Sequence, residues 1–258
     1  MKNIWAVLRK ELLVFFVSPA AYVVLTGFLS LSIFFFFVYL ASYNAMLSKY
    51  AAAPFRMGDF STLNLNERVI EVYFHTLILL LLFMMPLLSM RMFAEERRQG
   101  TFEFLFTSPL KVAELVWGKY LSLACVVLLM SLLGGLLPLT LYLLGQPEGW
   151  PIVSGLFGVV LSGLLYASLG LACSALSDNQ IVAGIMTLVT LLVLYLGYVL
   201  GASVGGTIQL LLEHVSPAWQ VMDLLRGVVS VRSVIYFSTA IAAGLFVCQR
   251  ALDAERWR

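Results

Sequence analysis

The chain has 258 residues, of which 61% are hydrophobic and 12% charged, with a mean hydropathy of +0.96 and a formal net charge of +2. A soluble domain carries charge on roughly a quarter of its residues, so this composition excludes a soluble protein and predicts an integral membrane protein. The small net charge gives no sign of a nucleic-acid partner.

Six apolar stretches have the length that crosses a bilayer, which is about 20 residues in a helix. They lack the alternating polarity of membrane β-barrel strands, and helices satisfy their own backbone polar groups in lipid. The predicted fold class is therefore all-α, with one transmembrane domain over residues 1–258. We expect its six membrane helices near residues 20–42, 70–92, 117–144, 152–176, 180–204 and 233–250.

Residues 1–18 precede the first span and form a predicted amphipathic helix that lies along the membrane surface. The apolar run after them is too long for a signal peptide and ends in no cleavage site, so we expect a retained span. Lys2, Arg9 and Lys10 lie off the apolar face, which is formed by Ile4, Trp5, Leu8, Leu12 and Phe15.

Three Ser-Pro pairs punctuate the chain, in "FFVSPAAY", "LFTSPLKV" and "EHVSPAWQ". Serine caps orphan N–H groups at a helix start, and proline has the backbone angle of the first helical position. Each pair is therefore predicted to begin a helix. The cysteines Cys125, Cys173 and Cys248 fall inside predicted spans and indicate no disulfide framework.

The segment "AEERRQGTFEFLFTSP", residues 94–109, is unusually polar for this chain. Gly100 would cost a continuous helix about 1 kcal/mol, and Thr101 can cap a new turn that contains Glu103. We therefore expect a helix, a break and a short second helix, with Phe102 and its neighbours on the bundle and the charges toward water. The alternative is a solvated loop. The upstream charges are Glu95, Glu96, Arg97 and Arg98.

The basic residues are unevenly divided between the two sides that six spans create. The positive-inside rule places the richer side, with both termini and residues 94–107, in the cytoplasm. That side holds Lys2, Arg9, Lys10, Arg91, Arg97, Arg98, Lys111, Lys119, Arg250, Arg256 and Arg258, and the other holds Lys49, Arg56, Arg68, Arg226 and Arg232.

The spans themselves carry no evident source of energy. Their interior holds one ionisable group, His75, which no metal-ligand cluster accompanies, whereas ion-coupled carriers need buried relays. Gly118 and Lys119 are followed by Tyr120 and do not form a P-loop. Mechanical work would therefore need energy from a partner, and residues 94–107 are the natural contact surface.

An enzymatic alternative rests on "GASVG", residues 201–205, which matches the G-x-S-x-G pattern around nucleophilic serines. Ser203 would need a base, and His75 and His214 are the two histidines. A simpler interpretation is close helix packing in lipid, because glycines recur at every fourth position. These are Gly197, Gly201 and Gly205.

Three stretches carry a resemblance to a known family. "MRMFAEERRQGTFEFLFTSPL" resembles the segment after the second span of ABC-2 type transporter permease proteins. "LRKELLVFFVSPAAYVV" is similar to that family's N-terminal helix and first span, and "SPAWQVMDLLRGVVSVRSVIYF" to the stretch before its last span. The resemblance covers the whole chain and is greatest to the permease subgroup of gliding-motility ABC exporters.

The resemblance implies half of a type V exporter in the bacterial inner membrane, paired with itself or a related permease. Separate cytoplasmic P-loop ATPase subunits would bind ATP and Mg, and this chain would hold no cofactor and no catalytic residue. The coupling helix would lie in residues 94–107, with Glu95, Glu96, Arg97, Arg98, Gly100, Thr101 and Glu103. The dimer seam would follow the first and fifth spans, with the glycine stripe, and residues 207–227 would form re-entrant helices at the outer face.

The resulting functional hypothesis is export of a hydrophobic or amphipathic substrate, driven by the partner ATPase, with a possible accessory periplasmic or membrane protein. Two alternatives remain open. One is an intramembrane hydrolase that uses Ser203. The other is a membrane anchor for an assembly that transports nothing.

Overall fold

The computed structural model describes residues 2–52, 64–98, 100, 111–143, 148–201 and 206–256. All regular structure in these residues is helical. The elements are α1 (Lys2–Val17), α2 (Pro19–Ala52), η2 (Asn66–Glu71), α3 (Val72–Ser89), α4 (Ala94–Arg98), α6 (Val112–Gly135), η3 (Leu137–Leu143), α7 (Gly149–Ala175), α8 (Gln180–Gly201), α9 (Thr207–Val215), α10 (Pro217–Leu225) and α11 (Val231–Arg256).

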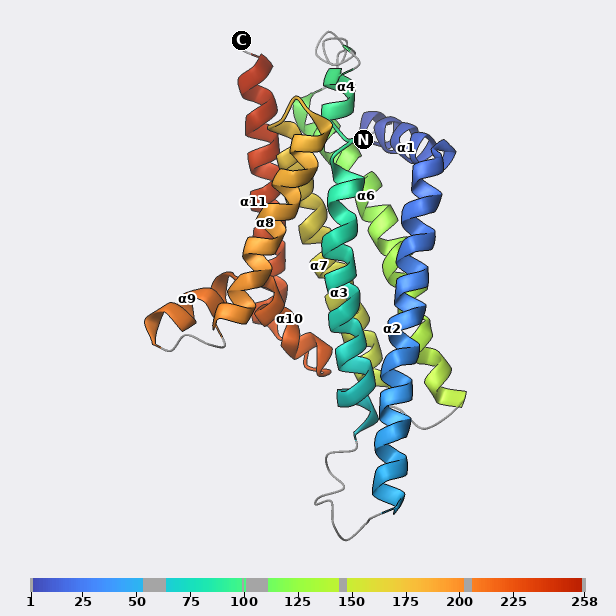
Figure 1. Cartoon of the computed structure of the whole chain (residues 1–258). Coiled ribbons are helices and arrows are strands. Elements are labelled where there is room, and N and C mark those ends of the chain that lie inside the picture. The colour runs from blue at the N-terminus through green and yellow to red at the C-terminus, as the bar shows by residue number, and fades with distance from the viewer. Residues whose placement is uncertain are drawn as a thin grey trace.

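Six helical segments in the described part of the chain are long and apolar enough to cross a membrane, which confirms the predicted fold class. Both ends of the chain lie at the same end of the upright bundle (Figure 1). We call this the terminal end and the opposite one the far end. The spans are Pro19–Ala52, Asn66–Arg98, Val112–Tyr142, Gly149–Ala175, Gln180–Leu200 and Val231–Glu255.

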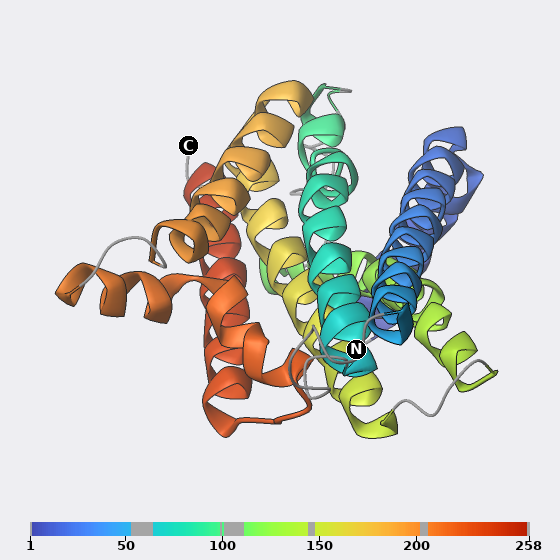
Figure 2. The same ribbon diagram turned by 60° about the horizontal axis from the view of Figure 1, so that its bottom comes forward.

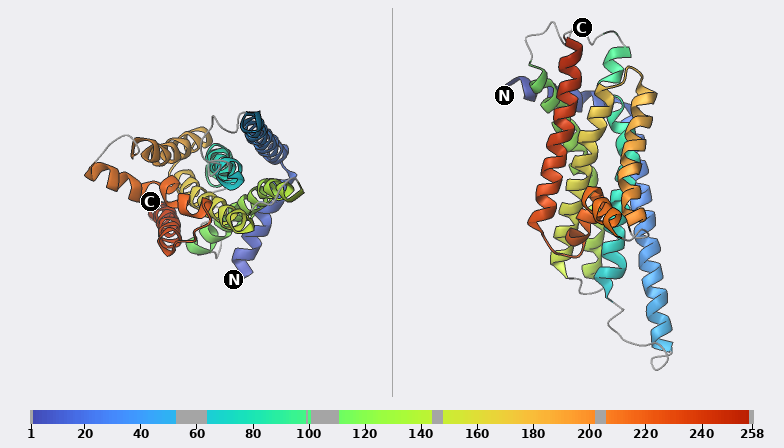
Figure 3. Two further views of the ribbon diagram at one scale, coloured as in Figure 1. Left: turned by 90° about the horizontal axis from the view of Figure 1, so that it is seen from below. Right: turned by 90° about the vertical axis from the view of Figure 1, so that its left-hand side faces the viewer.

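The centre of the bundle is formed by α3 and α7, and α2, α8 and α11 lie around it (Figure 3). Glycines allow the close approach of these helices. A Cβ on Gly155 of α7 would lie 2.5 Å from the ring of Phe74 in α3, and one on Gly163 would lie 2.5 Å from Val127 in α6. Small residues on α7 therefore set its position against two neighbouring helices.

The first membrane helix is longer than its apolar run predicts. The expected span ends near residue 42, but α2 continues to Ala52 and has 34 residues, or about 50 Å of helix. The segment "NAMLSKYAA" contains good helix formers, so the polar residues Asn44 and Lys49 do not stop it. The helix therefore projects beyond its neighbours at the far end (Figure 1).

Helix α1 crosses the terminal end of the bundle instead of running along it (Figure 3). Its predicted apolar face is largely turned inward, with Leu8 buried and Leu12 and Phe15 packed on the core. Trp5 is an exception and is exposed. The apolar face of α1 therefore packs largely against α6, and the placement of the helix along a membrane surface stays a prediction. The apolar residues that α1 exposes are Trp5, Leu13, Val14, Phe16 and Val17.

Two of the Ser-Pro pairs do begin helices, since α2 starts at Pro19 and α10 at Pro217. Ser216 does not cap its helix as expected, since it makes no side-chain cap bond. Ser18 Oγ accepts hydrogen bonds from Arg91. Proline at the first helical position is sufficient to mark these starts. The third pair, at residues 108–109, lies outside the described residues.

Two short helices, α9 and α10, occupy most of residues 207–227 and run across the bundle (Figure 2). Gly227, with φ of 90°, ends this segment in a conformation that favours glycine. The Trp150 indole donates a 2.7 Å hydrogen bond to the Gly227 carbonyl, which ties the turn to α7. Their re-entrant placement in a membrane stays a prediction.

Candidate functional site

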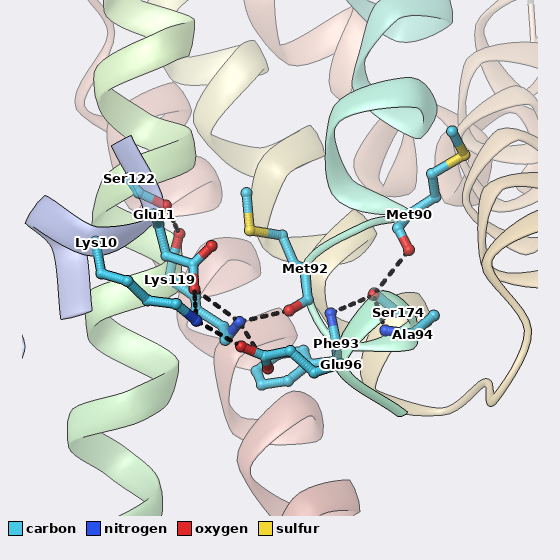
Figure 4. Close-up of polar contacts among 10 residues, drawn as sticks. All are labelled: Lys10, Glu11, Met90, Met92, Phe93, Ala94, Glu96, Lys119, Ser122 and Ser174. Atoms are coloured by element: carbon cyan, nitrogen blue, oxygen red, sulfur yellow. Dashed lines mark hydrogen bonds and ion pairs between the residues drawn. The ribbon is translucent and has the colours of Figure 1, made fainter. Parts of the chain in front are cut away.

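The polar segment after α3 is fixed to α7 by one serine. The first N–H groups of a helix have no partner within it, and here Ser174 Oγ accepts from the Phe93 N–H at 3.1 Å and the Ala94 N–H at 3.4 Å. The same hydroxyl donates to the Met90 carbonyl at 3.4 Å (Figure 4). Ser174 thereby holds the turn and the start of α4 in one position.

A closed ring of four ion pairs joins α4 to α1 and α6 (Figure 4). Lys119 of α6 lies 3.0 Å from Glu11 and 2.9 Å from Glu96. Lys10 lies 3.2 Å from Glu11 and 2.9 Å from Glu96. The ring contains two cations and two anions in alternation, so it is neutral as a whole. We call Lys10, Glu11, Glu96 and Lys119 the charge ring.

Lys119 is the buried member of the charge ring, with a side chain that is 1% exposed. The Lys119 ammonium donates hydrogen bonds to Glu11 Oε1 and the Met92 carbonyl, and Glu96 Oε2 lies 2.9 Å from Nζ as a second ion-pair partner. The Phe93 ring adds a face 4.9 Å from Nζ. A buried charge is tolerated when it is paired and hydrogen-bonded, and Lys119 has two ion-pair partners and two hydrogen-bond acceptors.

The charge ring also controls ionisation in α1. Burial disfavours the Glu11 carboxylate, but Lys119 and Lys10 outweigh it and lower the pKa of Glu11 below its usual value of 4.5. Burial likewise disfavours the charged form of Lys10, yet its hydrogen bond to Glu96 and the charge of Glu11 raise the pKa of Lys10. Lys10 and Glu11 are therefore both held in their charged forms near neutral pH.

The neighbouring residue, Arg97, connects α4 to the other side of the bundle. Its guanidinium binds Asp178 at 3.0 Å, in the turn between α7 and α8, and Glu255 of α11 at 2.5 Å. It also donates to the Ala175 carbonyl at 2.6 Å. The Arg97 side chain is only 8% exposed. Glu96 and Arg97 thus tie one short helix to two separate groups of helices.

A third contact involves the α1–α2 junction. Arg91 donates to Ser18 Oγ at 3.3 and 3.4 Å and forms an ion pair with Glu95 at 3.3 Å. A largely apolar cavity of about 480 Å³ adjoins these groups, between the α1–α2 junction and the end of α3. Gln180, at the start of α8, completes its lining.

These contacts change the expected orientation of the charged segment. We predicted that its charges face water, but Glu96 and Arg97 point into the chain, because α1, α6, α7 and α11 supply opposite charges and acceptors. Arg98 is exposed. Gly100 has φ of 69°, which fits the predicted break after the first helix. Thr101 and Glu103 lie outside the described residues.

The sequence analysis missed Lys119, which looked like an ordinary cation at the membrane boundary. One signal pointed to it. Glu11 is the single acid among residues 1–18, a cationic segment, and an isolated carboxylate beside an apolar face indicates a buried partner. The partner's identity depends on tertiary contacts more than a hundred residues away in sequence.

The glycine stripe begins with a contact inside the chain. A Cβ on Gly197 would lie 3.5 Å from Ser216 and 3.8 Å from Leu212, because α9 and α10 fold back on α8. The sequence analysis assigned this glycine to a seam between two chains, whereas the structure gives it a neighbour within one. Gly201 is the last residue of α8, and Gly205 lies outside the described residues.

The two histidines of the hydrolase alternative have different neighbours in the described part of the chain. The His75 ring packs 6.1 Å from Tyr195 and 5.7 Å from Tyr198, centroid to centroid. His214 Nε2 lies 3.0 Å from Arg232. Ser203 is outside the described residues, and these contain no group of three potential metal ligands.

Comparison with known proteins agrees with this architecture. A search of curated proteins found no match to the chain. The family model described as ABC-2 family transporter protein matches residues 39–248, which take in the second to fifth membrane helices, the last part of the first and most of the sixth. The family consists of transmembrane subunits that associate with separate ATP-binding subunits. The chain belongs to the ABC-2 transporter family and is a transmembrane ABC transporter permease.

Proposed function

We propose that the chain couples ATP hydrolysis in partner subunits to the export of a hydrophobic or amphipathic substrate. The observation that carries this proposal is the double attachment of α4. Glu96 binds α1 and α6 through the charge ring, and Arg97 binds the α7–α8 turn and α11. A force applied to α4 would therefore reach both sides of the bundle at once.

The energetic demand on such a contact is considerable. Moving a two-state bundle from 1:99 to 99:1 requires about 5.5 kcal/mol of differential binding. A flexible loop would change its own conformation under this binding free energy and would not pass it on to the spans. A short helix whose first turn is bonded to Ser174 and whose side chains are ion-paired can transmit it.

The surface that meets the ATPase then lies within residues 94–107. Arg98 is exposed at the terminal end and is the described residue that suits this contact. Glu96 and Arg97 act as braces behind it, and Glu95 supports Arg91. This assignment divides the predicted coupling residues into those that touch a partner and those that hold the helix.

The remaining features of the proposal follow from residue distribution and family membership. The excess of basic residues at the terminal end favours a cytoplasmic location for it, in a bacterial inner membrane. A second permease copy would pack against α2 and α8. The resemblance to the gliding-motility subgroup is part of the same proposal.

Charge reversal tests the partner contact. The permease carrying Arg98→Glu should co-purify with less ATPase than the unchanged protein, by about tenfold. Arg9→Glu is the matched control, since Arg9 is also an exposed arginine, on α1 at the same end. Equal recovery of the ATPase with both variants would contradict the assigned surface, and a chain that purifies alone would favour the anchor alternative.

Replacement of Glu96, one of the residues that hold α4, tests whether α4 transmits the signal between the ATPase and the spans. Glu96→Gln keeps the size of the side chain but opens the charge ring, so ATPase binding should persist while substrate no longer stimulates hydrolysis. Asp223→Asn, on α10 at the far end, also replaces a carboxylate with an amide away from α4 and should leave the stimulation intact. Full stimulation in Glu96→Gln would show that α4 does not transmit the signal.

A further inference from the structure

Two cavities that share lining residues lie at the far end of the bundle, around the base of α3. The first, of about 520 Å³, reaches from η2 to α8 and α10, and its lining includes His75, Tyr198 and Met222. The second, of about 470 Å³, lies between η2, the start of α7 and the end of α10. Figure 2 shows these elements from the far end. Glu67 and Glu71 line both cavities.

Carboxylates outnumber guanidiniums in each cavity. The first contains Glu67 and Glu71 with Arg68, and the second adds Glu148 and contains one arginine, Arg226. Arg226 Nε forms an ion pair with Glu71 Oε1 at 3.1 Å, so one carboxylate is already compensated. The excess of negative charge favours a cationic ligand.

Two polar atoms beside the carboxylates have no hydrogen-bond partner among the described residues. Asn66 lines the second cavity and is 9% exposed, and its buried Oδ1 is without a donor there. His75 lines the first cavity, and its buried Nε2 is also without a partner in the described part of the chain. A buried polar atom costs free energy unless it is paired, so these atoms indicate a binding function.

The local backbone supports the same interpretation. Asn66–Glu71 is a π-helical segment, η2, which leads directly into α3. Such segments are rare and are frequent at functional sites, because the wider turn alters which side chains share a face. Here the segment supplies Asn66, Glu67 and Glu71 to one cavity.

An aromatic wall completes the first cavity. The Tyr198 ring lies 5.7 Å from the His75 ring and 5.3 Å from the Trp219 ring, centroid to centroid, which fixes its orientation. The negative face of an aromatic ring attracts ammonium groups, including quaternary ones. An aromatic ring next to two carboxylates is a suitable environment for such a cation.

We propose that this pair of cavities binds an organic ammonium group, with Glu67 as its counter-ion and Tyr198 as its aromatic contact. A compact metal ion fits less well, since the described residues contain no group of three potential metal ligands. The ammonium group belongs either to a zwitterionic lipid or to a soluble amine. Its role as a substrate contact on the far side of the membrane rests on the proposed export function, but its binding does not.

Binding is measured on the purified permease alone, by calorimetric titration with choline. The matched control ligand is 3,3-dimethylbutan-1-ol, which has the shape of choline without its charge. We expect saturable binding of choline and none of the neutral analogue. Because no ATPase or transport is involved, failure of this experiment is distinguishable from failure of the export proposal.

Variants assign the binding to the cavities. Glu67→Gln should weaken choline binding about tenfold, whereas Asp223→Asn removes an exposed carboxylate from α10 outside both linings and should have no effect. Tyr198→Leu should weaken binding, and Tyr198→Phe, which keeps the ring face, should retain it. Fluorescence-detected gel filtration checks that each variant is folded.

Native mass spectrometry distinguishes the two sources of the ammonium group. Preferential retention of phosphatidylethanolamine over phosphatidylglycerol, lost in Glu67→Gln, would assign the site to a lipid headgroup. Choline binding without lipid preference would assign it to a soluble cation. If neither ligand binds, or if Glu67→Gln binds both as the unchanged protein does, the proposal is overturned.

Discussion

Lys119 shows how a membrane helix can contain a fully buried cation. The ammonium is removed from water, and the desolvation cost is offset by two carboxylates, one carbonyl and one aromatic ring. Lys10 belongs to the same charge ring but is 55% exposed. The two lysines therefore share two carboxylate partners in very different surroundings, and this permits a comparison of their contributions.

Replacement of the buried lysine should be far more costly than replacement of the exposed one. Lys119→Met leaves Glu11 and Glu96 without their buried counter-charge and should lower the free energy of unfolding by about 3 kcal/mol. Lys10→Met should lower it by less than about 1 kcal/mol, because water screens that pair. Unfolding by SDS in mixed micelles measures both. Similar losses in the two variants would contradict the burial of Lys119.

Acid should weaken the charge ring through Glu11. Its pKa is lower in the folded chain than its usual 4.5, so the folded state binds that proton less readily than the unfolded state. The stabilisation is present above pH 4.5 and is lost as the pH falls through the folded-state pKa. Glu11→Gln should therefore show a flatter decline in melting temperature between pH 7 and pH 3. Parallel curves for the two proteins would refute this role.

At the scale of elements, α1 is positioned by close contact as well as by charge. A Cβ on Gly118 of α6 would lie 2.7 Å from the Val7 side chain and 3.2 Å from the Ile4 carbonyl. The glycine is therefore needed for α1 to approach α6 and for Glu11 to reach Lys119. Sequence periodicity predicted the helix, but it could not show which face α6 covers, because that depends on a glycine far along the chain.

A single methyl group should lift α1 from the bundle. Gly118→Ala should destabilise the protein by about 1–3 kcal/mol, because the added carbon meets Val7 and a backbone carbonyl. Gly27→Ala is the matched control, since its Cβ would have nothing within 4 Å, and it should be neutral or stabilising. Limited trypsin digestion at Arg9 and Lys10 reports the displacement. Equal digestion of both variants would argue against the close contact.

At the scale of the whole molecule, the sequence predicted the number of membrane spans and their approximate bounds, because lipid requires each span to be long and apolar. It also located the break at Gly100 and the helix start at Pro217. It did not predict the inward turn of Glu96 and Arg97, since pairing between distant segments leaves no local pattern. The far-end cavities escaped notice for the same reason, because η2, α7, α8 and α10 meet there only in the folded chain.

The proposed second copy can be tested on the helices that the bundle covers least. Helices α2 and α8 are among the least buried spans and flank α3 on one side, whereas α11 lies elsewhere around the bundle (Figure 3). In a background with the exposed Cys125 changed to serine, cysteines at Phe34 of α2 and Val193 of α8 should cross-link two chains. Both positions are exposed and lie about 20 Å along their helices from the terminal end.

The control pairs the cysteine at Phe34 with one at Ala243, an exposed position at similar depth on α11. Lipid would cover α2, α8 and α11 equally if the chain were alone, so a monomer gives no preference between the two pairs. A dimer seam along the first and fifth spans gives cross-links only to Val193. Equal cross-linking of both pairs would contradict a seam along α2 and α8. The second permease copy would then pack on other helices, and the substrate path between the two copies would have different walls.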